Sequence, residues 1–162
     1  MPFEVTELGP QGTVHDPPMQ SLAIASDTLT VTTTGPGLFE ISADVHAFVK
    51  RSGVREGTCT LTVLHTSASL VIQENADPDV RRDLQAFFER LEPEGDPLYR
   101  HVAEGPDDMP AHVKSALLPT TITLSVSQGH ARLGRWQGVY CWEHRRRGSR
   151  RKVAIVVMGT TA

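Results

Sequence analysis

Strand-like stretches dominate this chain, and they limit the folds that it can adopt. From Thr58 to His65 the residues alternate, so that Cys59, Leu61 and Val63 fall on one face and threonines on the other. Similar stretches, rich in β-branched residues or alternating, cover residues 27–34, 121–127, 132–144 and 151–158. Because few helices separate them, they predict an α+β fold with a mostly antiparallel β-sandwich core.

Two or three helices are expected beside these strands. The firmest pattern follows Asp77, which can cap a helix that has Pro78 in its first turn. Asn75 is an alternative cap. An apolar stripe at helical spacing then contains Val80, Leu84, Phe87, Phe88 and Leu91.

Shorter helices are predicted on either side of this one. Ser42 can cap a helix that ends at Gly53. Another, from about Pro110 to Leu117, would be capped by Asp107 or Asp108. The stretch from residue 93 to 110 has no regular pattern, and such a long insert in a compact domain is usually functional or disordered.

The 162 residues are enough for one domain, 1–162, with residues 1–26 as an extended N-terminal arm. A net charge of −3 with 22% charged residues fits neither a disordered chain nor a strongly basic nucleic-acid binder. There is no secretory signal and no apolar run of about 20 residues that could cross a membrane. Cys59 and Cys141 are expected to be buried reduced thiols, and we expect a cytoplasmic protein.

Polar residues gather in three places along the sequence. They are residues 65–77, residues 101–112, and the segments Trp136-Gln137-Gly138 and Glu143-His144-Arg145. Neutral imidazoles and carboxylates are good ligands for divalent cations. One interpretation is a shared polar site that contains four histidines together with nearby acidic residues, namely His65, His101, His112 and His144.

Each of these features also has a plain structural interpretation. His65 and His144 each end an apolar strand face, where a histidine is often a hydrogen-bonded core residue. The acidic loop before His112 could simply be solvated, and the strict zinc motif H-E-x-x-H is absent. The basic run of residues 145–152 is either a solvated hairpin tip or a phosphate clamp, for which Arg145 is the best candidate.

Five short motifs occur in these same places. They are H-T-S-A-S-L from His65, Q-E-N-A-D-P from Gln73, E-G-P-D-D-M-P-A-H ending at His112, L-G-R-W-Q-G from Leu133, and E-H-R from Glu143. In these motifs the chain resembles the YjbQ (UPF0047) family, often labelled secondary thiamine-phosphate synthase. The resemblance runs from about Asp27 to Gly159.

The resemblance implies a YjbQ-like β-sandwich domain that assembles as a homotrimer and holds a divalent metal ion, zinc or magnesium, in a polar cleft. It nominates His65, His101, His112 and His144 as metal ligands. It implies acid–base or supporting roles for six residues, Glu74, Asn75, Asp77, Glu104, Asp107 and Asp108. Contacts to a phosphorylated small molecule would come from Lys114, Arg145, Gln137, Ser67 and Ser69.

Three functions are compatible with these residues. The first is a thiamine-phosphate synthase-like transferase, in which a thiazole phosphate attacks a pyrimidine-methyl diphosphate and releases diphosphate. The second is a metal-dependent hydrolase or lyase that acts on a small phosphorylated metabolite. The third is a non-catalytic trimeric module that binds a ligand or metal. No membrane or nucleic-acid partner is expected.

Overall fold

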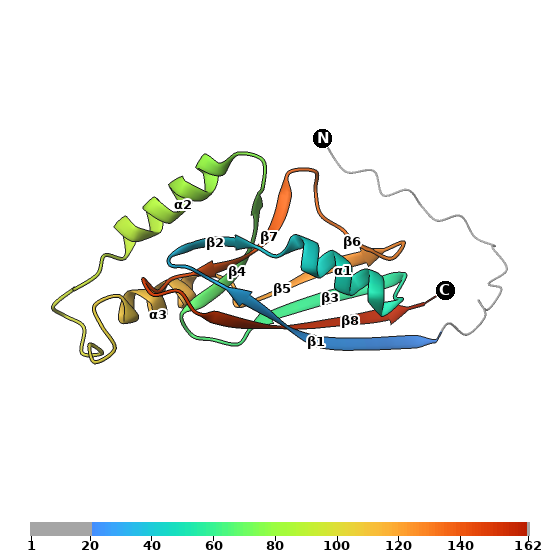
Figure 1. Cartoon of the computed structure of the whole chain (residues 1–162), viewed down its shortest axis with the longest axis horizontal. Coiled ribbons are helices and arrows are strands. Elements are labelled where there is room, and N and C mark those ends of the chain that lie inside the picture. The colour runs from blue at the N-terminus through green and yellow to red at the C-terminus, as the bar shows by residue number, and fades with distance from the viewer. Residues whose placement is uncertain (1–20, 162) are drawn as a thin grey trace, which may run out of the picture.

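Two antiparallel sheets form the core of the computed structural model, which describes residues 21–161 (Figure 1). The larger sheet has the order β1-β8-β3-β5-β6, with bounds Leu22–Thr32, Arg150–Thr160, Glu56–Val63, Thr121–Ser127 and His130–Ala131. The smaller sheet has the order β2-β7-β4, with bounds Gly37–Glu40, Gln137–Glu143 and Ala68–Glu74. The predicted α+β fold with mostly antiparallel strands is confirmed.

Alternation in the strands produces the core. The inward positions of β3 are Cys59, Leu61 and Val63, all buried as the pattern predicts. Alternate residues of β8 and residues of the smaller sheet pack into the same apolar cluster, among them Ile155 and Val139. Both sheets thus contribute side chains to one core, which is the arrangement of a sandwich.

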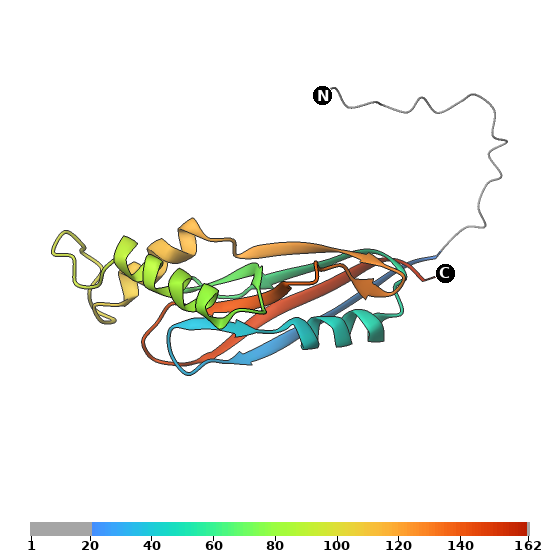
Figure 2. The ribbon, with the colours of Figure 1, turned by 90° about the horizontal axis from the view of Figure 1, so that it is seen from above.

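Three helices flank the sheets in the described part of the chain: α1 (Ser42–Ser52), α2 (Pro78–Leu91) and α3 (Asp108–Leu117). The α2 cap is as predicted, because the Asp77 carboxylate accepts a hydrogen bond from the Asp79 amide at 2.8 Å. Gly53 ends α1 with φ of 75°, as expected of a left-handed C-cap. Figures 1 and 2 place α2, α3 and the loop between them at one end of the sandwich, and α1 toward the other.

The other two predicted caps make no side-chain cap hydrogen bond, although the N-cap position of Asp107 is as predicted. Ile41, not Ser42, occupies the N-cap position of α1, and the Ser42 hydroxyl instead donates to Glu40 and accepts from the Val139 amide. Asp107 occupies the N-cap position of α3 but makes no side-chain cap bond. Its carboxylate is occupied by Arg145 and the amide of the following arginine.

Strands β2 and β4 were not predicted from the sequence, and several strand bounds differ from the prediction, most clearly those of β1 and β7. β1 begins at Leu22, because it pairs with β8 along its whole length from Leu22 opposite Thr160. The expected extended arm is therefore wrong for residues 22–26, and its first 20 residues lie outside the described chain. The strand expected over 132–144 shortens to β7, because residues 132–136 carry the chain from β6 in the larger sheet to β7 in the smaller one.

The apolar stripe of α2 is only half covered. The helix has no buried residue, and Phe87 and Leu91 keep 50% and 51% of their surface exposed. Both cysteines are buried and free, and burial raises the pKa of Cys59 to about 11. Between residues 21 and 161 there is no helix that is both long and apolar enough to span a membrane.

Candidate metal centre and adjoining pocket

A buried carboxylate at the start of α3 is the centre of the candidate site. Asp108 Oδ2 lies 2.7 Å from His101 Nε2 and 3.5 Å from His112 Nε2. Asp108 and His112 are one helical turn apart on α3, whereas His101 comes from the loop that precedes the helix. One potential ligand atom from each of the three residues lies within 4.8 Å of the other two.

Arg145 supports this arrangement from the β7–β8 connection. Its Nη1 donates to Asp108 Oδ1, and its Nε donates to Asp107 Oδ2 at 2.9 Å. Its Nη2 also donates to the Glu104 carbonyl at 2.8 Å. Burial works to raise the pKa of Asp107, but hydrogen bonds from the Arg146 amide and Arg145 outweigh it and lower that pKa. The Asp107 carboxylate is therefore ionised at neutral pH, and Arg145 holds the acidic loop in place.

The hydrogen bonds of His112 suit a metal ligand. Its Nδ1 lies 3.1 Å from the carbonyl oxygen of Thr66, which can only accept, so we assign the ring proton to Nδ1. That assignment leaves a lone pair on Nε2, which faces Asp108. A histidine ligand is commonly oriented by such a bond from its other nitrogen to a carbonyl.

Two imidazole nitrogens and one carboxylate oxygen fit a borderline divalent ion. Zn²⁺ is commonly bound by such a set in catalytic sites, where a coordination position stays open. Mg²⁺ prefers an octahedron of oxygen ligands. The side chains of His101 and His112 are 47% and 33% exposed, so the cluster is open to solvent on the histidine side. The donor set therefore favours zinc over magnesium.

His65 has the opposite hydrogen-bonding pattern. Its Nδ1 accepts the Ser67 amide at 3.2 Å and lies 3.0 Å from the Ser67 hydroxyl. An amide N–H only donates, so the neutral ring carries its proton on Nε2. Burial, followed by the charge of Arg151, lowers the pKa of His65, which keeps the ring neutral near pH 7. His65 therefore presents an N–H donor rather than a lone pair.

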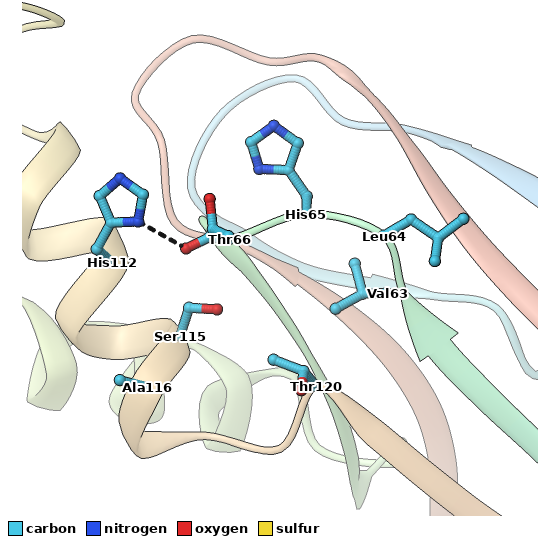
Figure 3. A pocket seen from close by; sticks show the side chains of 8 residues that line it. All are labelled: Val63, Leu64, His65, Thr66, His112, Ser115, Ala116 and Thr120. Atoms are coloured by element: carbon cyan, nitrogen blue, oxygen red, sulfur yellow. Dashed lines mark hydrogen bonds between the residues drawn. The ribbon is translucent and has the colours of Figure 1, made fainter.

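His65 and His112 line the same pocket of about 580 Å³, which we call the His65 pocket (Figure 3). Its walls come from the end of β3, the segment that follows it, and α3. Figure 3 shows the two imidazoles on either side of Thr66. The pocket is lined by Val63, Leu64, His65, Thr66, His112, Ser115, Ala116 and Thr120.

The fourth predicted histidine lies elsewhere. His144 is 4% exposed, and its Nε2 is 2.8 Å from the Ser69 hydroxyl. Burial, followed by the positive charge of Lys114, lowers the pKa of His144 to about 4. His144 and Lys114 line a different pocket, which does not include His101 or His112. The structure thus brings His101 and His112 together, with His65 beside His112, but not His144.

The predicted residues Glu74, Asn75 and Asp77 also lie away from the cluster within one chain. Glu74 ends β4 and the other two follow it, so the length of this seven-residue strand separates them from its Ala68 end by roughly 20 Å. There they stabilise a turn: Glu74 accepts the Asp77 amide, and the Asn75 side chain donates to the Gln137 carbonyl. Glu104 is closer, with Oε2 4.0 Å from Arg145 Nη1.

One buried feature next to His65 was not predicted from the sequence. Arg151 and Glu143 form a fully buried ion pair, with Arg151 Nε 2.6 Å from the carboxylate. Arg151 Nη2 also donates to the Ser67 hydroxyl at 3.1 Å, which links the pair to His65. Burial favours a raised pKa for Glu143, but the Arg151 bonds, the Arg145 amide and Thr33 together lower it. The sequence did contain a signal for it: Arg151 lies two residues before Val153 in β8, so both side chains are on the same, buried face of the strand.

Comparison with known proteins places this fold and these motifs in one family. The model of the "UPF0047 protein YjbQ-like" family matches residues 27–160. The chain belongs to the UPF0047 family. A UPF0047 protein of Synechocystis is 50% identical over 133 residues, covering 82% of this chain and 90% of the relative. The UPF0047 protein YjbQ of Escherichia coli O157:H7 is 38% identical over 133 residues, covering 82% and 96%.

Solved structures agree with the UPF0047 assignment. A conserved hypothetical protein from Thermus thermophilus is 35% identical, with a TM-score of 0.71 over 80% of this chain and 97% of that one. A YbjQ-like protein of unknown function from Sulfolobus solfataricus P2 has a TM-score of 0.79 over 86% of this chain and 99% of that one. Its identity is 21%, so that likeness concerns the fold alone.

Proposed function

We propose that this UPF0047 chain is a divalent-metal-dependent enzyme that acts on a phosphorylated small molecule. The observation that carries the proposal is the convergence of His101, Asp108 and His112 at the solvent-open edge of a pocket. Two further features support it. The carbonyl of Thr66 orients His112, and Arg145 holds Asp108 from the opposite side.

The reaction that we propose first is the coupling of a thiazole phosphate to a pyrimidine-methyl diphosphate, the activity with which UPF0047 proteins are often labelled. The thiazole nitrogen would form a bond to the methylene carbon as the carbon–oxygen bond to diphosphate breaks, and diphosphate would leave. A divalent ion bound by His101, Asp108 and His112 would supply positive charge that stabilises the departing diphosphate.

The chain's own residues would contribute orientation. The neutral His65 ring would donate its Nε2–H to an oxygen acceptor of the substrate in the His65 pocket. Arg145 would hold Asp107 and Asp108 in place, since each accepts a hydrogen bond from its guanidinium. The backbone segment that follows β3 orients both histidines, because the Thr66 carbonyl bonds His112 and the neighbouring Ser67 bonds His65.

The test is formation of thiamine phosphate from the two substrates by pure protein loaded with Zn²⁺ or Mg²⁺. Activity in the wild type that is lost in His112→Ala supports the proposal. The matched control is His130→Ala, because His130 begins β6 and its imidazole bonds only the Gln128 carbonyl among the described residues. Product formation equal to a protein-free blank, or unchanged in His112→Ala, would overturn this reaction.

A second candidate is hydrolysis or elimination on a small phosphorylated metabolite. It is favoured by the low number of protein ligands, since three ligands with an open position are typical of hydrolytic zinc sites. A screen of phosphate esters with several divalent ions separates it from the transferase, and metal binding with no turnover in either assay would indicate a binding module.

We also propose that the chain assembles as a homotrimer and works in the cytoplasm. The half-exposed apolar face of α2, with Phe87 and Leu91, offers surface that another copy could cover. Two buried cysteines in the free thiol form are consistent with a reducing compartment.

A further inference from the structure

Helix α3 separates two polar pockets. Lys114 comes two positions after His112, so it projects from α3 about 200° around the helix from that ligand. Two neighbouring residues of the β7–β8 connection also point to different pockets. Arg145 bonds Asp108 in the metal cluster, whereas His144 packs against the Trp142 ring, with ring centroids 5.7 Å apart. We call the second pocket, of about 310 Å³, the Lys114 pocket; its lining includes Lys114, His144, Gln85, Glu89, Glu92 and Arg146.

Lys114 is the unusual residue of this pocket. It is 6% exposed, yet among residues 21–161 no carboxylate lies within 4.0 Å of its ammonium and no hydrogen bond is made to it. A buried charge is unfavourable unless it is paired or hydrogen-bonded. The Lys114 ammonium is not sealed from solvent but opens onto the pocket. The Lys114 pocket therefore presents a positive charge that has no ion pair or hydrogen bond within the described chain.

The carboxylates around the pocket are already engaged. Glu94 pairs with Arg146 Nε at 2.9 Å, and Glu92 accepts the Tyr99 hydroxyl. Glu89 accepts from Gln85 Nε2 at 2.8 Å. Each of these three glutamates therefore already has a hydrogen-bonding or ion-pair partner other than Lys114. Their negative charges also oppose a ligand that carries more than one negative charge.

His144 adds a neutral polar group at the pocket wall. Its Nε2 is occupied by Ser69, while in the described structure its Nδ1 makes no hydrogen bond and is not sealed from solvent. The lowered pKa of about 4 keeps this ring uncharged at neutral pH. Next to it, the Trp142 indole donates to Gln85 Oε1 at 2.7 Å. Gln85 lines the pocket, so this hydrogen bond connects Trp142 to the pocket wall.

We propose that the Lys114 pocket binds a small molecule through a single carboxylate group, which pairs with the Lys114 ammonium beside His144. This site is separate from the metal cluster, because α3 lies between the two. The proposal does not rest on metal binding or on the proposed reaction, and each can fail without the other.

The experiment uses the two tryptophans of the chain as reporters. The indole N–H resonances of ¹⁵N-labelled protein are followed while propionate, inorganic phosphate or chloride is added at constant ionic strength and pH. Trp142 bonds a pocket residue, whereas Trp136 is 56% exposed and serves as the internal control. Propionate is expected to shift the Trp142 resonance saturably in the millimolar range and to leave Trp136 unmoved.

Variants connect the shift to Lys114. Lys114→Met is expected to abolish it, Lys114→Arg to retain it, and His112→Ala to leave it unchanged. If Lys114→Met does not fold, thermal unfolding replaces it: propionate should then raise the Tm of the wild type and of Lys114→Arg. No saturable Trp142 shift in the folded wild type would overturn the proposal. So would an equal shift in Lys114→Met, or tighter binding of phosphate than of propionate.

Discussion

His65 and His112 flank one pocket with opposite hydrogen-bonding polarity. The Ser67 amide donates to His65 Nδ1, whereas His112 Nδ1 donates to the Thr66 carbonyl. Two adjacent residues of one turn therefore set the two rings in opposite tautomers. His112 presents a lone pair to Asp108, and His65 presents an N–H to the pocket. Of the four histidines that the sequence nominated, this geometry favours His101 and His112 as ligands and gives His65 a different role.

The tautomers can be observed directly. Long-range ¹H–¹⁵N spectra of metal-free protein at pH 7 are expected to show His65 neutral with its proton on Nε2, and His112, when neutral, with its proton on Nδ1. The lowered pKa of His65 predicts that its ring stays uncharged at that pH. A charged His65, or a proton on its Nδ1, would contradict the assignment.

The buried His144 makes stability depend on acid. Its pKa in the folded chain is about 4, against the ordinary 6.5, so the unfolded chain takes up this proton first as the pH falls. The contribution of neutral His144 to the free energy of unfolding is complete above about pH 6.5. It declines by about 3 kcal/mol as the pH falls toward 4. Urea unfolding at pH 7 and pH 4.5 should show a smaller difference for His144→Gln than for the wild type. His130→Gln is the matched control and should keep the wild-type difference.

The Glu143–Arg151 pair is expected to be costly to break. Arg151→Met leaves the Glu143 carboxylate, which is fully buried, without its main partner. We expect a loss of about 3–5 kcal/mol in the free energy of unfolding, measured by chemical denaturation. Glu143→Met combined with Arg151→Met removes both charges and should be more stable than Arg151→Met alone. A double variant no more stable than that single variant would show that the unpaired charge is not the cause.

The proposed trimer has a simple mutational test. Phe87→Glu places a charge on the half-exposed apolar face of α2 and is expected to shift sedimentation from trimer toward monomer. Arg82→Ala changes an exposed residue of the same helix, whose ion pair with Asp79 is at the surface, and should leave the mass unchanged. A wild type that sediments as a monomer would contradict the trimer itself.

Local patterns predicted much of the fold. The alternation of Cys59, Leu61 and Val63 identified β3 and its buried face, and Asp77 with Gly53 marked helix ends correctly. These signals act within a few residues of the chain, so a single sequence contains them. The start of β1 could not be predicted from local patterns, because its first residues form a strand only through pairing with the far end of β8.

The site was predictable in composition but not in grouping. The sequence placed four histidines together, yet Asp108 meets Arg145 across 37 positions and His144 belongs to another pocket. One local signal was overlooked: His112 and Lys114 are two positions apart on a predicted helix and cannot face the same site. The buried Glu143–Arg151 pair depends on how the two sheets stack, which alternation alone does not define.

Zinc titration by calorimetry tests the central claim most directly, with metal-free wild type compared against Asp108→Asn, His112→Ala and His144→Gln. We predict one Zn²⁺ per chain, with affinity falling about 10-fold or more in Asp108→Asn and His112→Ala. His144→Gln should bind as the wild type does, because His144 lies outside the cluster. The account would be contradicted if Asp108→Asn and His112→Ala bound zinc as tightly as the wild type, or if His144→Gln alone lost it.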